Sequence, residues 1–199
     1  TGIEIINIPM QELLDEIKAI PMPNPEELIK EAPNDNIKKA LPVAEQIYLA
    51  LKKIIKKYQL NGFTLRCFDL LTAVKNTGCL ALAKFNSEGI IATCEGDVPA
   101  MLSMAITNSL ASVSGFQANP AHINPTSGEM MFAHCTIPFN MIERYEFDTH
   151  FESGIGVGIR GYMKNGPVTI FKVSGDLSRH FAEEGELVNS QAKPNLCRT

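Results

Sequence analysis

Apolar residues recur every three or four positions along residues 36–58, the longest regular pattern in the chain. This spacing places them on one face of a helix, so we predict a long amphipathic helix there. Asp35 or Asn36 can cap its start, and Asn61-Gly62 can end it. Pro42 either bends this helix or marks its true start. The apolar positions are Ile37, Leu41, Ala44, Ile47, Leu51, Ile54, Ile55 and Tyr58.

Shorter apolar runs surround this helix and predict an alternation of strands and helices. Residues 3–8 predict a buried strand, and residues 63–68 predict a second strand directly after the long helix. Two strands joined through helices pair in parallel, so we expect these two to be neighbours. A further strand is expected at residues 89–93. The remaining predictions are helices at residues 10–20, at 26–31 after a proline-rich loop, from residue 70, and from Pro99 to Leu110, whereas residues 78–85 show a mixed pattern.

The second part of the chain has a different pattern, in which short β-type runs alternate with turn signals such as Asn119-Pro120 and Asn124-Pro125. Strands are expected at residues 129–135, 155–163, 168–173 and 181–188. Asn165-Gly166 lies between two of these runs and predicts a β-hairpin. An antiparallel sheet or a small barrel fits this part of the chain.

The predicted fold class is therefore α/β with two units. Residues 1–113 are expected to form part of an open, Rossmann-like parallel sheet domain. Residues 114–199 are expected to form a mostly antiparallel, barrel-like β domain. The chain opens directly on an apolar run and stops at Cys197-Arg198-Thr199, so we expect more protein on either side.

Composition narrows the possible functions. A net charge of -4 argues against nucleic acid as a partner, because phosphate binding needs a clustered basic face. The only basic cluster, Lys52, Lys53, Lys56 and Lys57, has the spacing of a solvated helix face. No apolar run approaches the roughly 20 residues that span a bilayer, which predicts a cytoplasmic protein without a membrane partner.

Cysteine usage agrees with this compartment. The chain has five cysteines, an odd number, and none of them are in C-x-x-C spacing. This pattern favours reduced thiols over a disulfide framework or a structural zinc site. We expect most of them to be buried as small apolar side chains. They are Cys67, Cys79, Cys94, Cys135 and Cys197.

Candidate chemistry begins at Cys94-Glu95-Gly96-Asp97, between a predicted strand and a predicted helix. Ligands of open α/β sheets bind beyond the carboxyl ends of strands, so Glu95 and Asp97 are well placed for a site. Asn119 and His134 follow within about forty residues of the chain, and together with Glu95 they offer the donor types of a divalent metal site. Either carboxylate could instead cap the following helix, and we consider this the more frequent role for Asp97.

The other conspicuous residues fit structural roles at least as well. His134 follows strand-like residues, where a histidine is more often a hydrogen-bonded core residue than a ligand. His122, His150 and His180 have similar surface or core alternatives. The glycines of residues 154–161 favour a strand with close backbone neighbours over a phosphate loop. The chain contains neither a G-x-S-x-G elbow nor an H-E-x-x-H helix motif.

Several ordered blocks nevertheless resemble the L-fucose isomerase-like proteins, relatives of the L-fucose and L-arabinose isomerases. The similarity covers about residues 60 to 199 well and the first 60 more loosely. Its blocks are Leu65-Arg66-Cys67-Phe68, Gly78-Cys79-Leu80-Ala81-Leu82, residues 88–100, His134-Cys135, His150-Phe151-Glu152-Ser153, Gly166-Pro167-Val168-Thr169 and Cys197-Arg198-Thr199.

This resemblance implies a metal-dependent aldose-ketose isomerase, usually with manganese, that acts through an enediol. It also implies a longer subunit, in which a missing N-terminal α/β domain precedes the middle domain represented here. The implied partners are a small sugar substrate and further copies of the same subunit, in a trimer or hexamer with sites near the interfaces.

Carried over by position, Glu95 matches the family's metal-binding acid/base glutamate. The family's second carboxylate falls at Asn119, whose amide oxygen can bind a cation but cannot accept a proton near neutral pH. His134 matches a residue that lines the site, and the family's last histidine ligand falls beyond Thr199. The sequence therefore predicts a catalytic and metal-binding Glu95, a metal-binding Asn119 and a substrate-binding His134.

Three functional hypotheses follow. The leading one is a carbohydrate isomerase of the L-fucose or L-arabinose type. The second is a non-catalytic sugar-binding relative, because Asn119 replaces an acid that the chemistry normally uses. The third is that this piece of the chain is a structural part of a multidomain enzyme and is inactive alone.

Overall fold

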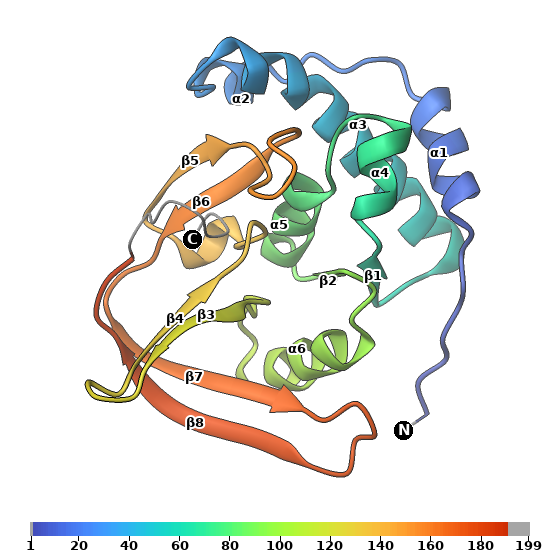
Figure 1. Cartoon of the computed structure of the whole chain (residues 1–199). Coiled ribbons are helices and arrows are strands. Elements are labelled where there is room, and N and C mark those ends of the chain that lie inside the picture. The colour runs from blue at the N-terminus through green and yellow to red at the C-terminus, as the bar shows by residue number, and fades with distance from the viewer. Residues whose placement is uncertain (1, 191–199) are drawn as a thin grey trace.

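Helices enclose a short pair of parallel strands in the computed structural model, which describes residues 2–190 (Figure 1). Strands β1 (Gly62–Leu65) and β2 (Ile91–Cys94) pair in parallel, with Gly62 opposite Ile91 and Leu65 opposite Cys94. The helices are α1 (Met10–Ala19), α2 (Glu26–Lys30), α3 (Asp35–Tyr58), α4 (Phe68–Ala73), α5 (Cys79–Ser87) and α6 (Val98–Ala111). The prediction of a mixed α/β protein is confirmed at this level.

The long helix α3 has the predicted apolar face, but its ends differ from the prediction. Asn34, rather than Asp35 or Asn36, caps its start, and its side-chain oxygen accepts a hydrogen bond from the Ile37 amide. Pro42 lies inside the helix, so it does not mark the start. The helix ends at Tyr58, because Gln59 adopts a left-handed conformation with φ of 52°.

The lysines of α3 form the predicted solvated face. Lys52, Lys53 and Lys57 are all exposed. Lys53 lies 3.5 Å from Glu16, and Lys57 lies 2.8 Å from Glu12. This face therefore carries surface ion pairs with α1.

The predicted first strand is wrong. Residues 3–8 form no strand, and Ile3, Ile5 and Ile6 are 50%, 70% and 41% exposed. Residues 63–68 also differ, because the strand covers only Gly62–Leu65 and residues 66–68 turn into α4. The parallel neighbour of this strand is β2, which contains most of the predicted third strand. An apolar run alone therefore did not specify which strands pair. Strand pairing also depends on which strand edge remains accessible after the helices have packed.

The described residues after α6 form three antiparallel pairs (Figure 1). The strand at Asn119–Asn124 replaces a predicted turn region, and Arg144–Asp148 forms a strand that the pattern did not indicate. The short 3-10 helix η1 (Phe139–Met141) separates the first pair from the second. The strands are β3 (Asn119–Asn124) with β4 (Glu129–Ala133), β5 (Arg144–Asp148) with β6 (Gly158–Tyr162), and β7 (Gly166–Val173) with β8 (His180–Leu187).

The predicted hairpin at Asn165-Gly166 is also wrong. These residues join β6 to β7, but β6 pairs with β5 and β7 pairs with β8. The Asn165-Gly166 segment thus connects two different sheets, because the strands before and after it pair with other strands. Within residues 2–190 the sheets remain separate two-stranded pairs, and no barrel closes. The open Rossmann-like sheet and the barrel remain predictions for a longer protein.

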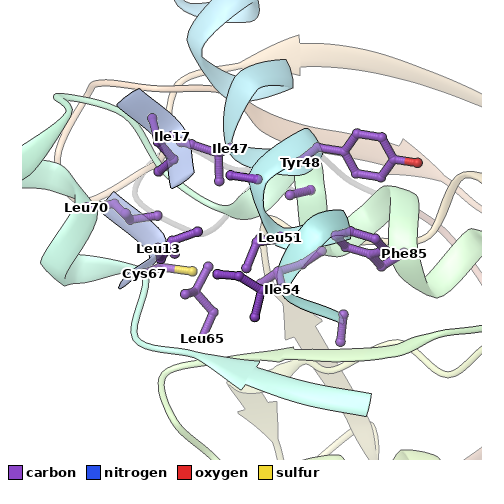
Figure 2. Close-up of a cluster of buried hydrophobic side chains, with 14 of the residues drawn as sticks. Leu13, Ile17, Ile47, Tyr48, Leu51, Ile54, Leu65, Cys67, Leu70 and Phe85 are labelled. Carbon is purple, nitrogen blue, oxygen red and sulfur yellow. The ribbon is translucent and has the colours of Figure 1, made fainter. Parts of the chain in front are cut away.

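The larger apolar core lies between the helices and the parallel strands. Figure 2 shows Leu13 and Ile17 of α1, Ile47 and Leu51 of α3, and Phe85 of α5 converging on this core. A second cluster brings together Ile37, Leu41 and Leu80 with Phe147 and Ile159, so segments from both sides of residue 113 share it. The division into domains at residue 113 stays a prediction. Among the described residues, no helix combines the length and apolar character needed to cross a bilayer.

Candidate functional site

Glu95 lies at the carboxyl end of the parallel pair, as the sequence predicted. Leu65 and Cys94 are opposite each other in the register, so Arg66 and Glu95 leave the two strands side by side. Glu95 has a φ of 67°, and Gly96 follows with a φ of 73°. A left-handed conformation is unfavourable for a residue with a side chain, so this turn is maintained by the structure around it. Glu95 consequently points away from the packed strand, and its side chain is 43% exposed.

Two amide side chains hold β2 in place. Asn86 of α5 is buried; it accepts a hydrogen bond from the Ala92 amide at 2.9 Å and donates one to the Ala92 carbonyl at 2.6 Å. Gln117 does the same for Cys94, accepting from its amide at 2.7 Å and donating to its carbonyl at 3.4 Å. Each amide imitates a neighbouring strand, which satisfies backbone groups that β2 would otherwise leave unpaired. The turn at Glu95 is therefore anchored from two sides.

His134 faces Glu95 from the segment that follows β4. Its Nε2 lies 4.0 Å from Oε1 of Glu95, and its Nδ1 lies 3.0 Å from Oγ1 of Thr136. The His134 side chain is only 3% exposed. Burial, with a further contribution from His150, lowers the pKa of His134 to about 4. The imidazole is therefore neutral at pH 7, and its approach to Glu95 is a polar contact and not a strong ion pair.

Asn119 begins β3 and pairs with Ala133, the residue before His134. Gln117, two residues before Asn119, binds the backbone of Cys94, the residue before Glu95. The β3–β4 pair and the Gln117 amide thus bring the segments of Glu95, Asn119 and His134 together, although Asn119 itself is exposed. Among residues 2–190, no cluster of three or more His, Cys, Asp or Glu side chains has the geometry to hold a metal ion.

Asp97 has the capping role that the sequence favoured. Its Oδ1 accepts a hydrogen bond from the Ala100 amide at 2.8 Å, at the start of α6. Its Oδ2 lies 3.1 Å from Nζ of Lys172 on β7. Asp97 therefore joins the start of α6 to the β7–β8 pair, next to the Glu95 turn.

The other histidines separate into one buried residue and two exposed ones. His150 is 7% exposed, and its Nδ1 lies 3.0 Å from Oγ of Ser153. Its ring packs edge to face with Phe68, whose own side chain remains 46% exposed. His122 lies on exposed β3 and His180 begins exposed β8. His150 and Phe68 thus extend the edge that holds Glu95.

The glycine-rich segment has the predicted structural role. Residues 158–162 form β6, and no phosphate-binding loop is formed there. Gly156, with a φ of 71°, lies so close to Thr77 that a Cβ atom would be 2.9 Å from its amide nitrogen. The absence of a side chain at this position permits close backbone packing.

Reduced, buried cysteines lie beneath the site, as the sequence predicted for most of them. Cys67 and Cys94 have their sulfur atoms 3.0 Å apart, and Cys79 and Cys135 have theirs 3.1 Å apart. All four are free thiols. The hydrogen bond to the partner cysteine, together with burial, raises the pKa of the Cys67 and Cys135 thiols. Cys197 lies outside the described residues.

Sequence reasoning missed three residues that shape this edge. Gln117 anchors β2, Thr136 hydrogen-bonds His134, and Phe68 presents an exposed ring beside His150. The short interval between Gln117 and Asn119 was the only available signal for the first. Thr136 follows His134 by two residues, which in an extended segment puts both side chains on one face. Phe68 carried no signal, because it was assigned to a strand that ends earlier.

Comparison with known proteins shows a distant similarity between part of this chain and part of several sulfoquinovose isomerases. The chain is 28% identical over 130 residues to a sulfoquinovose isomerase of Priestia aryabhattai, a match that covers 62% of this chain and 29% of the relative. It is 25% identical over 134 residues to a sulfoquinovose isomerase of Alkalicoccus urumqiensis, covering 64% of this chain and 30% of that protein. The chain thus spans less than a third of the length of these relatives. No protein-family model matches it.

Proposed function

We propose that this chain belongs to a sugar isomerase that interconverts an aldose and a ketose through an enediol. The observation that carries the proposal is the Glu95 carboxylate, held in a left-handed turn at the end of a parallel strand and facing a buried, neutral His134. The distant similarity to sulfoquinovose isomerases supports the same reaction class. More specifically, the resemblance to L-fucose isomerase-like proteins leads us to propose an isomerase of the L-fucose or L-arabinose type.

In the proposed reaction, Glu95 moves one proton between C1 and C2 of the open-chain sugar. A carboxylate can remove the proton from C2 of the aldose and return it to C1. The hydroxyl proton on O2 passes to O1 through water in the same conversion, which leaves a ketose. The partial exposure of Glu95 allows a sugar to approach it, whereas its anchored backbone keeps its direction fixed. The neutral His134 can hydrogen-bond a sugar oxygen without adding a charge near the carboxylate.

We also propose that a divalent cation, manganese by resemblance, is held by Glu95 and Asn119. Their carboxylate and amide oxygens are suitable donor types, and the neutral His134 imidazole faces Glu95 at 4.0 Å. Among the described residues, no group of three or more His, Cys, Asp or Glu side chains could hold the cation by itself. Further ligands must therefore come from the substrate, water or other protein segments. When bound, such a cation supplies polarisation of the sugar carbonyl.

The test is isomerisation of sulfoquinovose by the intact protein, followed by the appearance of the ketose with and without added Mn²⁺. Glu95→Gln keeps the size of the side chain and removes the base, so we expect activity to fall by about a hundredfold or more. Glu129→Gln, at the exposed start of β4, is the matched carboxylate control and should retain activity. Equal activity in the wild type and Glu95→Gln would overturn the role of Glu95.

A non-catalytic sugar-binding protein is the second candidate, and Asn119 is the observation that favours it. An amide supplies no negative charge to a cation and cannot exchange protons near neutral pH. If Asn119 limits the reaction, Asn119→Asp should raise turnover and tighten Mn²⁺ binding. Saturable sugar binding without turnover, in both the wild type and Asn119→Asp, would favour the second candidate.

The resemblance also leads us to propose a homo-oligomer, a trimer or hexamer, for the intact protein. The cation proposed above needs ligands beyond Glu95 and Asn119, and a neighbouring subunit is one source of them. Light scattering on the intact protein tests this directly. A monomer at the concentration used for activity measurements would contradict it.

A further inference from the structure

Arg66 directly follows β1, as Glu95 directly follows β2. It follows Leu65, which lies opposite Cys94 in the parallel register. The backbones of neighbouring strands are about 5 Å apart, so the two side chains leave the same edge side by side. The contact is close: a Cβ atom at Gly96 would lie 3.4 Å from Cγ of Arg66. Arg66 therefore belongs to the edge that carries the proposed reaction.

The guanidinium of Arg66 is accessible to a ligand. Its side chain is 74% exposed, and its Nε lies 3.5 Å from Oδ2 of Asp69. An exposed ion pair of this kind is weak, so a ligand can compete with Asp69 for the guanidinium. The other nearby cation, Lys172, lies 3.1 Å from Asp97 on the α6 side of the turn.

Charge near Glu95 determines which sugars can bind. A sugar with an anionic substituent is repelled by the Glu95 carboxylate unless a cation lies within its reach. Arg66 provides that cation on the neighbouring strand, while a neutral sugar would gain nothing from it. A guanidinium presents paired N–H donors that match the oxygens of a sulfonate or phosphate.

We propose that Arg66 is a specificity-determining residue that binds an oxyanion substituent at the far end of the sugar, so that the substrate is an anionic sugar. This inference rests on the proposed isomerase function and names the substrate class of the same site. Phe68, two residues further along the same turn, is 46% exposed and packs edge to face with His150. Sulfoquinovose, a glucose with a sulfonate at C6, is the first substrate to test because the similar proteins are named for it.

The experiment compares sulfoquinovose with quinovose, the same sugar without the sulfonate, and with glucose 6-phosphate. For each sugar, kcat/KM and the dissociation constant are measured on the intact wild-type protein, Arg66→Gln, Arg66→Lys and Arg144→Gln. Arg144 is an exposed arginine on β5 that pairs with Glu146, so it is the matched control. Glucose 6-phosphate distinguishes recognition of a sulfonate from recognition of any oxyanion.

In Arg66→Gln we expect kcat/KM for sulfoquinovose to fall by about 10- to 100-fold, the usual effect of losing hydrogen bonds to a charged group. The quinovose value should stay within about twofold, so the preference itself is lost. Arg66→Lys should retain part of the preference, and Arg144→Gln all of it. An unchanged preference in Arg66→Gln, or an equal loss for both sugars, would overturn the inference.

Binding separates failure of this inference from failure of the proposed function. Isomerisation of quinovose and sulfoquinovose with no dependence on Arg66 would support the function and overturn the inference. Sulfoquinovose binding that depends on Arg66, without turnover, would support the inference and overturn the isomerase. Wild-type protein that binds none of the three sugars would overturn both.

Discussion

The parallel pair β1–β2 and the antiparallel pair β7–β8 differ in almost every physical respect. All but the first residue of β2 are buried, and side chains from α5 and the segment before β3 hold its backbone. In β8 all residues except Leu187 are exposed, and within residues 2–190 the strand that pairs with it is β7. A side chain that extends from the first pair starts from a rigid base, which a catalytic carboxylate needs. The long antiparallel pair has room for charged residues but offers no comparable support.

A matched truncation gives the largest contrast between the two regions. Phe85 of α5 is fully buried in the core, whereas Phe181 of β8 is 54% exposed. Phe85→Ala should lower the free energy of unfolding by about 3–5 kcal/mol, because it leaves a cavity. Phe181→Ala should change it by at most about 1 kcal/mol, since little buried area is lost. Urea titration of both variants measures the difference, and equal effects would contradict the contrast.

Acid should destabilise the site region before it affects the hairpins. The pKa of His134 is about 4 in the folded protein, below its ordinary value of 6.5. Below pH 6.5 the unfolded chain binds a proton that the folded protein does not bind until pH 4. Stability is therefore full above pH 6.5 and falls by about 3 kcal/mol as the pH drops to 4. Thermal unfolding across this range should show the loss in the wild type.

His134→Gln is the control for this pH dependence. It removes the titrating ring but keeps a polar side chain, so the loss between pH 6.5 and 4 should become smaller by the amount that His134 contributes. His122→Gln, at an exposed position on β3, should leave the pH profile unchanged. Identical pH profiles for the wild type and His134→Gln would contradict the assignment of this effect to His134.

The anchoring of β2 can be removed at Asn86. Asn86→Leu has a similar size but leaves the amide and carbonyl of Ala92 without their partner. Unsatisfied buried groups cost about 1–3 kcal/mol, so we expect a loss of that size in urea titration. Asn140→Ala, which removes an exposed amide, should change stability by less than about 0.5 kcal/mol. A neutral Asn86→Leu would show that β2 does not depend on this anchor.

At Thr93 of β2 we expect a substitution to raise the stability of the protein, and not to lower it. Thr93 is fully buried, and among the described residues its hydroxyl has no hydrogen-bond partner. Thr93→Val keeps the shape and removes the unsatisfied group, so we expect a gain of about 1 kcal/mol in thermal or urea unfolding. A loss of stability would show that the hydroxyl is satisfied in solution.

Sequence patterns predicted the elements whose buried face follows from the spacing of the apolar residues within the element itself. The apolar stripe of α3 and the strand-to-helix turn at Glu95 are of this kind, because neighbouring residues suffice to define them. Pairing partners could not be predicted in this way. Residues 3–8 have the composition of a strand, but no described strand pairs with them. By contrast, β3 forms from a segment with turn residues, and β5 from a segment without a strand signal, because β4 and β6 lie beside them.

The candidate site shows the same limit. Glu95 could be predicted because a carboxylate at a strand end is visible in the sequence. Gln117 and Thr136 could not, because their roles depend on contacts with Cys94 and His134 that only the fold creates. The low pKa of His134 has the same origin, since burial of this segment is decided by the packing around it.

Proton transfer by Glu95 is the central claim, and solvent deuterium exchange tests it most directly. The intact protein is incubated with sulfoquinovose and Mn²⁺ in D₂O, and NMR follows deuterium at C1 of the ketose and C2 of the aldose. The enediol mechanism predicts deuterium at these two carbons in the wild type and in Glu129→Gln, and none in Glu95→Gln. Deuterium incorporation at the wild-type rate in Glu95→Gln would contradict the claim.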